Sequence, residues 1–222
     1  MREVRRVGVA ANAQHGGGTL FTEPVLVVNQ KAKLVEINTE YAVYDQHGHQ
    51  IGAVREVGQS IVKKAIALRT DSVRSYRLQL VDINGHVLLE LTRPAKFFRS
   101  RLIVRDASGV GLGQIIQKNF GFFHAVRFGL EAGGQPVGSI SADDGRGWEF
   151  SIQDAAGNEI GRITKTWPGL AKAMFTKTEN YVVEINQSLV DPLRSLVIAA
   201  SLAVDLALKE LGGNDLGPAF RI

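Results

Sequence analysis

The residues best suited to binding chemistry lie in one short run between positions 93 and 101. Four cations and two adjacent aromatic residues share this run: Arg93, Lys96, Phe97, Phe98, Arg99 and Arg101. Each cation near a charged membrane surface attracts anionic headgroups by about 1 kcal/mol, and aromatic side chains can enter the lipid interface. The run therefore predicts a lipid-binding segment. The alternative is a solvated pair of strands with one phenylalanine in the core.

A second group of basic residues could extend this surface. Its members are Lys63, Lys64, Arg69, Arg74 and Arg77. A solvated protein face is the favoured interpretation of the group as a whole. We keep Lys63 and Lys64 as candidates for lipid binding because they are adjacent cations.

The sequence contains no recognisable combination of catalytic residues. His47 and His49 lie close to Asp45, and two histidines with one acid could hold a metal, but a polar turn is the favoured interpretation. No Ser-His-acid motif or phosphate loop occurs. The chain has no cysteine, which excludes disulfides, thiolate zinc sites and palmitoylation. We expect no enzymatic activity, no metal and no cofactor.

Composition is that of a folded protein with a modest surplus of positive charge. The 222 residues are 45% hydrophobic and 22% charged, with a net charge of +4. These values exclude disorder of the whole chain and fit an anionic partner without requiring one. Nucleic acid would need a denser basic and aromatic surface, so we expect none as a partner.

An acid three residues before a glycine recurs along the chain. The five segments are Asp45–Gly48, Asp82–Gly85, Asp106–Gly109, Glu131–Gly134 and Asp154–Gly157. Asp bonds to the backbone ahead of it and opens a turn, and Gly supplies the positive φ that closes it. Each segment lies between two strand-like runs, so the pattern predicts five β-hairpins. A meander of that size tends to close on itself.

A further glycine follows four of these turns at a fixed distance. It comes directly after an apolar residue, and another apolar residue lies two positions later; the glycines are Gly52, Gly113, Gly138 and Gly161. Positions three apart in a regular strand point to opposite faces. A β-bulge beside each glycine would put both apolar residues inside. Glycine merely tolerated at an edge is the alternative.

The last apolar segment predicts a buried helix over about residues 192–211. Asp191-Pro192 is a good helix start, and Gly212-Gly213-Asn214 ends it. Apolar residues surround this helix, which is typical of burial in protein or lipid. Arg194 and Asp205 leave too short an uncharged stretch for a membrane span, so we expect it to fill a barrel. Residues 1–20 then form a flexible arm, 21–212 the barrel domain and 213–222 a tail.

Several short motifs in this order resemble the phospholipid scramblase family, which is thought to share the Tubby-like fold with LURP-one-related proteins. The motifs are Leu26–Gln30, Tyr76–Asp82, Leu91–Pro94, Ile160–Trp167 and Glu179–Tyr181. The resemblance covers about residues 24 to 210. It implies a mainly β fold: a closed antiparallel barrel of about twelve strands that encloses a hydrophobic C-terminal helix.

The chain departs from the family pattern in two places. Animal scramblases carry a cysteine cluster for lipid attachment after the Arg-Pro pair, where this chain has Ala95 to Arg101. The family's Asp-rich calcium segment is replaced by one that offers only Glu179, Asn180 and Glu184 as oxygen ligands. Because calcium needs several oxygen ligands with enough negative charge, we expect no calcium dependence.

Together these features predict a cytoplasmic, scramblase-like protein that binds anionic phospholipid headgroups peripherally, at the inner face of the plasma membrane. The resemblance also implies lipid translocation as an activity. The alternative is a soluble protein-interaction or regulatory module that does not bind lipid.

Overall fold

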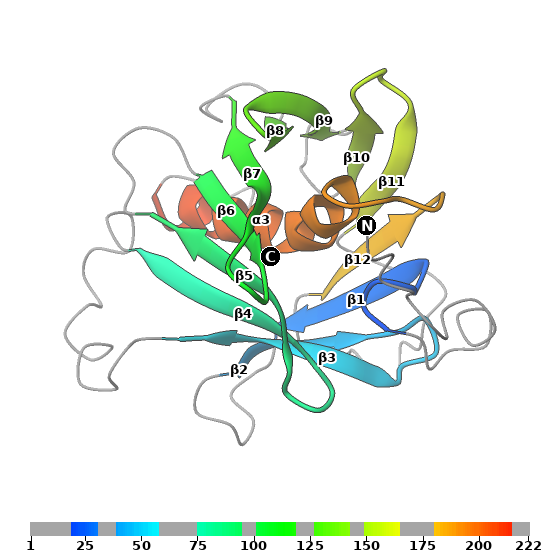
Figure 1. Cartoon of the computed structure of the whole chain (residues 1–222), viewed down its shortest axis with the longest axis vertical. Coiled ribbons are helices and arrows are strands. Elements are labelled where there is room, and N and C mark those ends of the chain that lie inside the picture. Colours follow the sequence, from blue (N-terminus) through cyan, green and yellow to red (C-terminus); the bar gives the residue numbers. More distant parts are fainter. Residues whose placement is uncertain are drawn as a thin grey trace.

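The chain folds into a closed barrel of twelve antiparallel strands around one C-terminal helix (Figure 1). The computed structural model describes residues 19–30, 39–57, 75–94, 101–118, 127–142, 149–164 and 180–214. The strands are β1 (Val25–Gln30), β2 (Thr39–Tyr44), β3 (Gln50–Glu56), β4 (Tyr76–Asp82), β5 (Val87–Arg93), β6 (Arg101–Asp106), β7 (Gly111–Gln117), β8 (Arg127–Ala132), β9 (Gln135–Ala142), β10 (Glu149–Asp154), β11 (Glu159–Thr164) and β12 (Asn180–Ile185).

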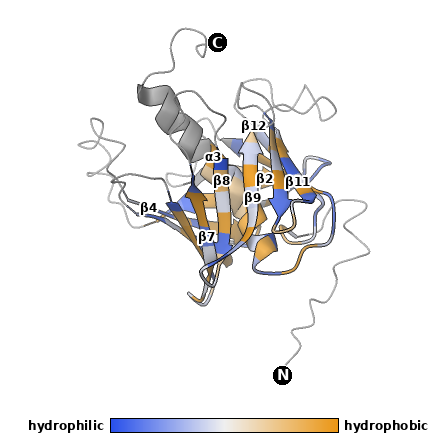
Figure 2. Cartoon of the chain, turned by 90° about the horizontal axis from the view of Figure 1, so that it is seen from above, coloured by the Kyte–Doolittle hydropathy of each residue, from blue (hydrophilic) through white to orange (hydrophobic). Residues whose placement is uncertain are grey.

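Each strand pairs with its neighbours in the sequence, and β1 pairs with β12 to close the barrel. Successive side chains in a strand alternate between the two faces. In β4, Leu78 and Leu80 are buried inside, whereas Arg77 and Gln79 alternate with them. Figure 2 shows the same mixture of hydrophobic and hydrophilic residues along several strands. The predicted fold class, a mainly β closed barrel of about twelve strands, is confirmed.

Helix α3 (Leu193–Asn214) runs across the centre of the barrel (Figure 1). Every residue from 194 to 204 is buried, as expected for a helix that is apolar on all sides. It begins one residue after the predicted start and ends three after the predicted end. Among the described residues, no helix has the length and hydropathy needed to cross a membrane.

The predicted hairpin turns are all present, and four of them share one hydrogen-bond network. In each of these four, one aspartate oxygen accepts the backbone N–H groups two and four residues later; the aspartates are Asp45, Asp82, Asp106 and Asp154. The glycine that closes each has a φ between 84° and 87°, a region that favours glycine.

The turn between β8 and β9 is built differently. Ala132 pairs with Gln135, so only Gly133 and Gly134 form the tip, and both have positive φ. This is the geometry of a two-residue hairpin. Glu131 therefore lies in the strand ladder and does not open the turn.

The predicted β-bulges are also present. The register of each of the four hairpins skips the apolar residue before the glycine: Ile51, Leu112, Val137 and Ile160. A fifth bulge, at Leu88, has no glycine. A Cβ added at Gly161 would lie 2.5 Å from the carbonyl oxygen of Glu184 on the neighbouring strand. The bulge thus brings two backbones too close for any residue but glycine.

Strand direction gives the barrel two distinct ends. The five hairpin turns and the start of α3 lie at one end, which we call the turn end. The other ends of the strands lie at the opposite end of the barrel, which we call the far end. The residues between these strand ends are outside the described residues: 31–38, 58–74, 95–100, 119–126, 143–148 and 165–179.

Candidate functional site

Two of the predicted lipid-binding residues are described, and they differ sharply in exposure. Arg93 ends β5 at the far end and is only 2% exposed, because it shares the inward phase of Leu89 and Leu91. Arg101 begins β6 and is exposed. The other six candidates lie outside the described residues: Lys63, Lys64, Lys96, Phe97, Phe98 and Arg99.

Arg101 is one of several arginines on the outer side of strands β3 to β6. Strand alternation places four arginines of β3, β4 and β6 on this outer side: Arg55, Arg77, Arg101 and Arg105. We call these residues the outer arginine face. Within strands β3 to β6, Glu90 on β5 is the one acidic residue that alternation places on the outer side.

Cross-strand pairing places two of these arginines in one row. Gln79 pairs with both Arg55 and Glu90, and Glu90 pairs with Arg105, so Arg55, Gln79, Glu90 and Arg105 form one row across β3–β6. The guanidinium of Arg55 donates to Oε1 of Gln79 at 3.3 Å, and Nε2 of Gln79 donates to Oε1 of Glu90 at 3.1 Å. Arg55, Gln79 and Glu90 thus form a hydrogen-bonded network on the outer arginine face.

A cavity of about 640 Å³ opens beside this network. Arg77 and Arg105 line it, together with Gln79, Glu90 and Thr92. A headgroup phosphate in such a cavity could accept hydrogen bonds from two guanidinium groups, whose planar donor arrays match phosphate oxygens. Among the described lining residues, two guanidinium groups stand against one carboxylate, so the cavity can attract an anion.

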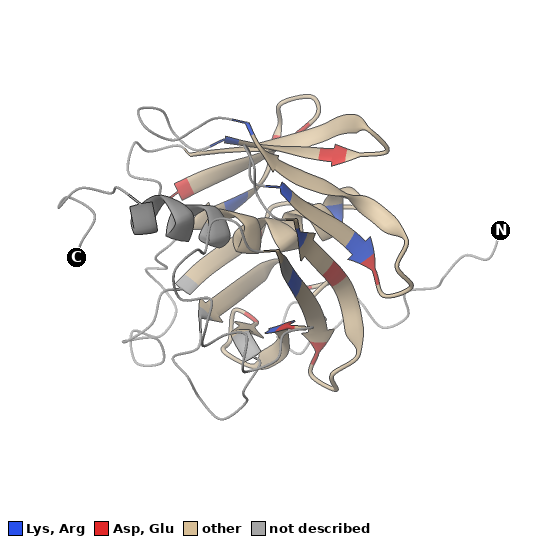
Figure 3. Cartoon of the chain, turned by 90° about the vertical axis from the view of Figure 1, so that its left-hand side faces the viewer, with Lys and Arg blue, Asp and Glu red and all other residues tan. Residues whose placement is uncertain are grey.

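The other side of the barrel carries charges too, but they form ion pairs. Lys118 Nζ lies 2.7 Å from Glu131 Oε1, and Arg162 lies 2.9 Å from Glu159 Oε2. The hydrogen bond from Lys118 lowers the pKa of Glu131. The hydrogen bond from Ser151, with that from Arg162, lowers the pKa of Glu159. We call this side the paired face. Figure 3 shows that basic residues are spread over several strands, with acidic residues between them.

Sequence reasoning missed two members of the outer arginine face, Arg55 and Arg105. Both follow a buried valine and could have been assigned outward from strand alternation alone. What the sequence did not give is the register that aligns β3 with β6. Arg77 was noted there only as part of a solvated face.

The segment that replaces the family's calcium site lies mainly in a strand. Asn180 begins β12 and Glu184 lies near its end, where it pairs with Val25 and Arg162, while Glu179 is outside the described residues. Within the described ranges, no group of three or more His, Cys, Asp or Glu side chains could hold a metal ion.

The two histidines near Asp45 take part in the β2–β3 turn. Asp45 is fully buried, and its Oδ1 accepts the backbone N–H of His47 and His49 at 2.8 Å. The Nδ1 atom of His49 lies 3.0 Å from Asp45 Oδ2. The equivalent position in the β4–β5 turn makes the same contact, between His86 and Asp82. The prediction of a polar turn therefore explains the positions of Asp45, His47 and His49.

A closed antiparallel barrel that holds a buried C-terminal helix and an arginine-rich outer side defines a β-barrel protein with a potential anion-binding surface. The profile of the Scramblase family matches residues 5–210, so the chain belongs to the Scramblase family. The resemblance seen in its sequence motifs is thereby confirmed.

Curated relatives agree with this family. The chain is 23% identical over 189 residues to the phospholipid scramblase family protein C343.06c of Schizosaccharomyces pombe, covering 76% of this chain and 48% of that protein. It is 25% identical over 201 residues to altered inheritance rate of mitochondria protein 25 of Saccharomyces cerevisiae, covering 76% and 60%. The chain thus spans about half to three fifths of their length.

Among solved structures, an X-ray structure of an Arabidopsis thaliana protein is similar with a TM-score of 0.49 and 11% sequence identity. The match covers 91% of this chain and 99% of that chain.

Proposed function

We propose that this protein binds anionic phospholipid surfaces peripherally through its outer arginine face, without catalysing a reaction. The observation that carries the proposal is the imbalance of charge on that face, where the outer side of β3–β6 carries four arginines and one glutamate. Membership of the Scramblase family supports a lipid as the anionic partner.

The energetics favour such a surface over the paired face. A basic residue near an anionic membrane contributes about 1 kcal/mol. A cation already paired with a carboxylate gains less, because its field is largely neutralised. Arg77 and Arg101 are exposed, and Arg105 lines the same cavity as Arg77. We leave Arg93 out of the proposed surface because its burial keeps it from a headgroup.

We propose lipid binding and not lipid translocation, because helix α3 fills the interior of the barrel. Residues 194–204 of α3 are buried within it, so the described interior offers no path for a headgroup. Translocation would need another route or a rearrangement of α3. If binding fails under all conditions, the competing function is a protein-interaction or regulatory module.

Co-sedimentation with vesicles tests the proposal. The protein is mixed with neutral or anionic phosphatidylserine-containing vesicles at low and high salt. We expect it to bind the anionic vesicles and to dissociate as salt rises, because salt screens exposed charges. The triple variant Arg77→Gln, Arg101→Gln, Arg105→Gln should bind on the order of a hundredfold more weakly, from about 1 kcal/mol per charge.

A matched control uses the paired face. The triple variant Lys118→Gln, Arg127→Gln, Arg162→Gln removes the same number of positive charges from the strands β7, β8 and β11 or their ends. It should retain most of the binding. Equal losses in the two triple variants would show that net charge alone matters and would overturn the assignment to the outer arginine face.

A further inference from the structure

The cavity at the outer arginine face, which we call the outer cavity, is lined by charges of both signs. Arg77 and Arg105 line it together with Glu90. Its volume of about 640 Å³ lies within the range of small-molecule sites, about 300–1,000 Å³. A ligand that presents only negative charge would be repelled by the carboxylate. A ligand with charges of both signs could bind all three groups.

The strand register places the two arginines on either side of β5. Glu90 of β5 lies directly opposite Arg105 of β6, and Thr92 of β5 lies directly opposite Arg77 of β4. Side chains that face each other in this way have Cβ atoms about 5 Å apart. A small headgroup that lies over β5 can therefore contact both guanidinium groups and the carboxylate at once.

The carboxylate of Glu90 is held in place and still has acceptor sites for a ligand. Gln79 Nε2 donates to Glu90 Oε1 at 3.1 Å, and Arg55 donates to Gln79 Oε1 at 3.3 Å. Among the described residues, Glu90 forms no ion pair, although Arg105 is its cross-strand neighbour. Because a carboxylate has about four acceptor sites, further donors can bind to it from the cavity.

The guanidinium groups of Arg77 and Arg105 have no hydrogen-bond or ion-pair partner among the described residues. Arg77 is exposed and Arg105 is half-buried. Their donors are therefore available to phosphate oxygens, which guanidinium groups bind well. On the paired face, by contrast, Lys118 and Arg162 each contact a glutamate.

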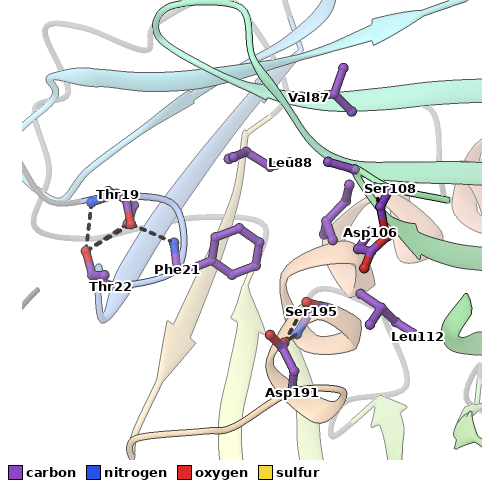
Figure 4. Close-up of a pocket in the computed structure, with 12 residues that line it drawn as sticks. Thr19, Phe21, Thr22, Val87, Leu88, Asp106, Ser108, Leu112, Asp191 and Ser195 are labelled. Carbon is purple, nitrogen blue, oxygen red and sulfur yellow. Dashed lines mark hydrogen bonds between the residues drawn. The ribbon is translucent and has the colours of Figure 1, made fainter. Parts of the chain in front are cut away.

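A second cavity, of about 580 Å³, lies at the turn end (Figure 4). Asp106 and Asp191 line it, and each accepts a hydrogen bond at 2.7 Å from a serine hydroxyl, that of Ser108 or Ser195. These bonds stabilise the β6–β7 turn and the start of α3, which gives both carboxylates a structural role. A phosphate would be repelled by Asp106 there, so we place the headgroup in the outer cavity.

We propose that the outer cavity selects phospholipids whose headgroup carries a primary ammonium, with the ammonium at Glu90 and the phosphate between Arg77 and Arg105. This inference rests on the proposed membrane binding and adds a lipid preference to it. A primary ammonium has three N–H donors for a carboxylate. A choline headgroup has the same charge but no N–H, so Glu90 distinguishes the two.

Vesicles that differ only in the head amine test this preference. All contain one fifth phosphatidylglycerol, and the remainder is phosphatidylcholine alone or an equal mixture of phosphatidylcholine and phosphatidylethanolamine. Their surface charge is the same, so general attraction of the arginines does not change. We expect the full chain to bind the phosphatidylethanolamine vesicles about fivefold more tightly, because one charge-assisted hydrogen bond is gained.

The two ways in which this experiment can fail are distinct. Equal binding to both kinds of vesicle would overturn the selectivity and leave the proposed membrane binding intact. No binding to either kind would overturn the membrane binding on which the inference rests.

Soluble glycerophosphoethanolamine distinguishes a membrane lipid from a free phosphate ester. It carries the same phosphate and primary ammonium but no acyl chains. In large molar excess over the protein, it should leave vesicle binding unchanged, because it lacks the anionic surface that attracts the other arginines. Displacement of the protein from vesicles would overturn a membrane lipid as the ligand of the cavity.

Substitution of Glu90 separates recognition of the ammonium from any effect of phosphatidylethanolamine on the bilayer itself. Glu90→Gln keeps an acceptor oxygen for Gln79 but removes the charge. It should abolish the preference for phosphatidylethanolamine, and it should bind the phosphatidylcholine vesicles at least as tightly as the parent protein, because a negative charge has left the basic surface. A bilayer effect alone would persist in this variant.

A matched control removes a carboxylate from the paired face. Glu131→Gln, at the glutamate that Lys118 contacts, should keep the parent preference. Circular dichroism establishes that each variant is folded. If Glu90→Gln does not fold, Glu90→Asp, which draws the carboxylate back by one methylene, replaces it and should reduce the preference. An undiminished preference in a folded variant at Glu90 would overturn its role in selecting the headgroup.

Discussion

The inner and outer faces of the same strands differ in the side chains that they carry. The inner face is mostly apolar, with Arg93 as an exception, and it packs around α3, whose residues 194–204 are all buried. The outer face of β3–β6 carries Arg55, Arg77, Arg101 and Arg105, with Glu90 as the one acidic residue that alternation places on that side of these strands. We therefore expect stability to depend mainly on the inner face, whereas a change of an outer charge should leave the fold intact. Substitutions on each face test this expectation.

The largest loss of stability is expected from the helix inside the barrel. Leu196 is fully buried in α3 and lies against β7. Leu196→Ala should reduce the free energy of unfolding by about 2–5 kcal/mol, because it removes buried methyl groups and leaves a cavity. Urea denaturation measures this loss. Ile83→Ala, at a position that is 69% exposed, is the control and should stay within about 0.5 kcal/mol of the parent protein.

A smaller loss is expected at the bulges that bend the strands. A Cβ at Gly113 would meet the backbone carbonyl of Glu131, whereas one at Gly111 would have nothing within 4 Å. Gly113→Ala should therefore cost about 1–3 kcal/mol of stability through strain. Gly111→Ala, two residues away in the same strand, should cost far less. Equal denaturation midpoints for the two variants would contradict the account of the bulges.

The outer arginines should matter little for folding. The triple variant Arg77→Gln, Arg101→Gln, Arg105→Gln should lie within about 0.5 kcal/mol per substitution of the parent protein, as is usual for surface positions. Urea denaturation of this variant checks the claim beside its vesicle binding. A loss comparable to that of Leu196→Ala would show that these side chains support the barrel, and their role in binding would then need another test.

The smallest effect is expected at the hairpin turns, and it depends on pH. Hydrogen bonds from Asn158 lower the pKa of Asp154 from its usual value of 3.8. A carboxylate with a lowered pKa stabilises the folded state above its unfolded pKa, and that contribution is lost as the pH falls through the folded value. Asp154→Asn should therefore destabilise the protein at pH 6, with a difference from the parent that shrinks toward pH 3. A difference that is constant with pH would show that the charge has no role in the turn.

Most of the fold could be predicted because its signals are local. The Asp and Gly spacing determines four of the five turns within four or five residues, and the apolar-Gly pattern marks the bulges at Gly52, Gly113, Gly138 and Gly161. The start of α3 is equally local, since Asp191 accepts from the backbone N–H of Ser195. Such features need no knowledge of distant strands.

The candidate site was harder to predict because it depends on which strands lie side by side. Arg55 and Arg105 are 50 positions apart in the sequence, and only the register of β3 to β6 brings them into one row. The inward orientation of Arg93 follows from its spacing to Leu89 and Leu91. Arg93 was predicted to bind lipid because it is one of the four cations in the run from 93 to 101, and that grouping carries no information on which face of the strand each side chain takes.

The most direct test of membrane binding through the outer arginine face uses site-specific labels. The chain has no cysteine, so a single cysteine can carry an environment-sensitive fluorophore at Thr92, beside Arg77 on the outer side of β5, or at Ser139 on the outer side of β9. On addition of anionic vesicles, we expect the label at Thr92 to shift to shorter wavelength and gain intensity, while the label at Ser139 stays unchanged. A response at Ser139 alone, or none at either position, would contradict the account.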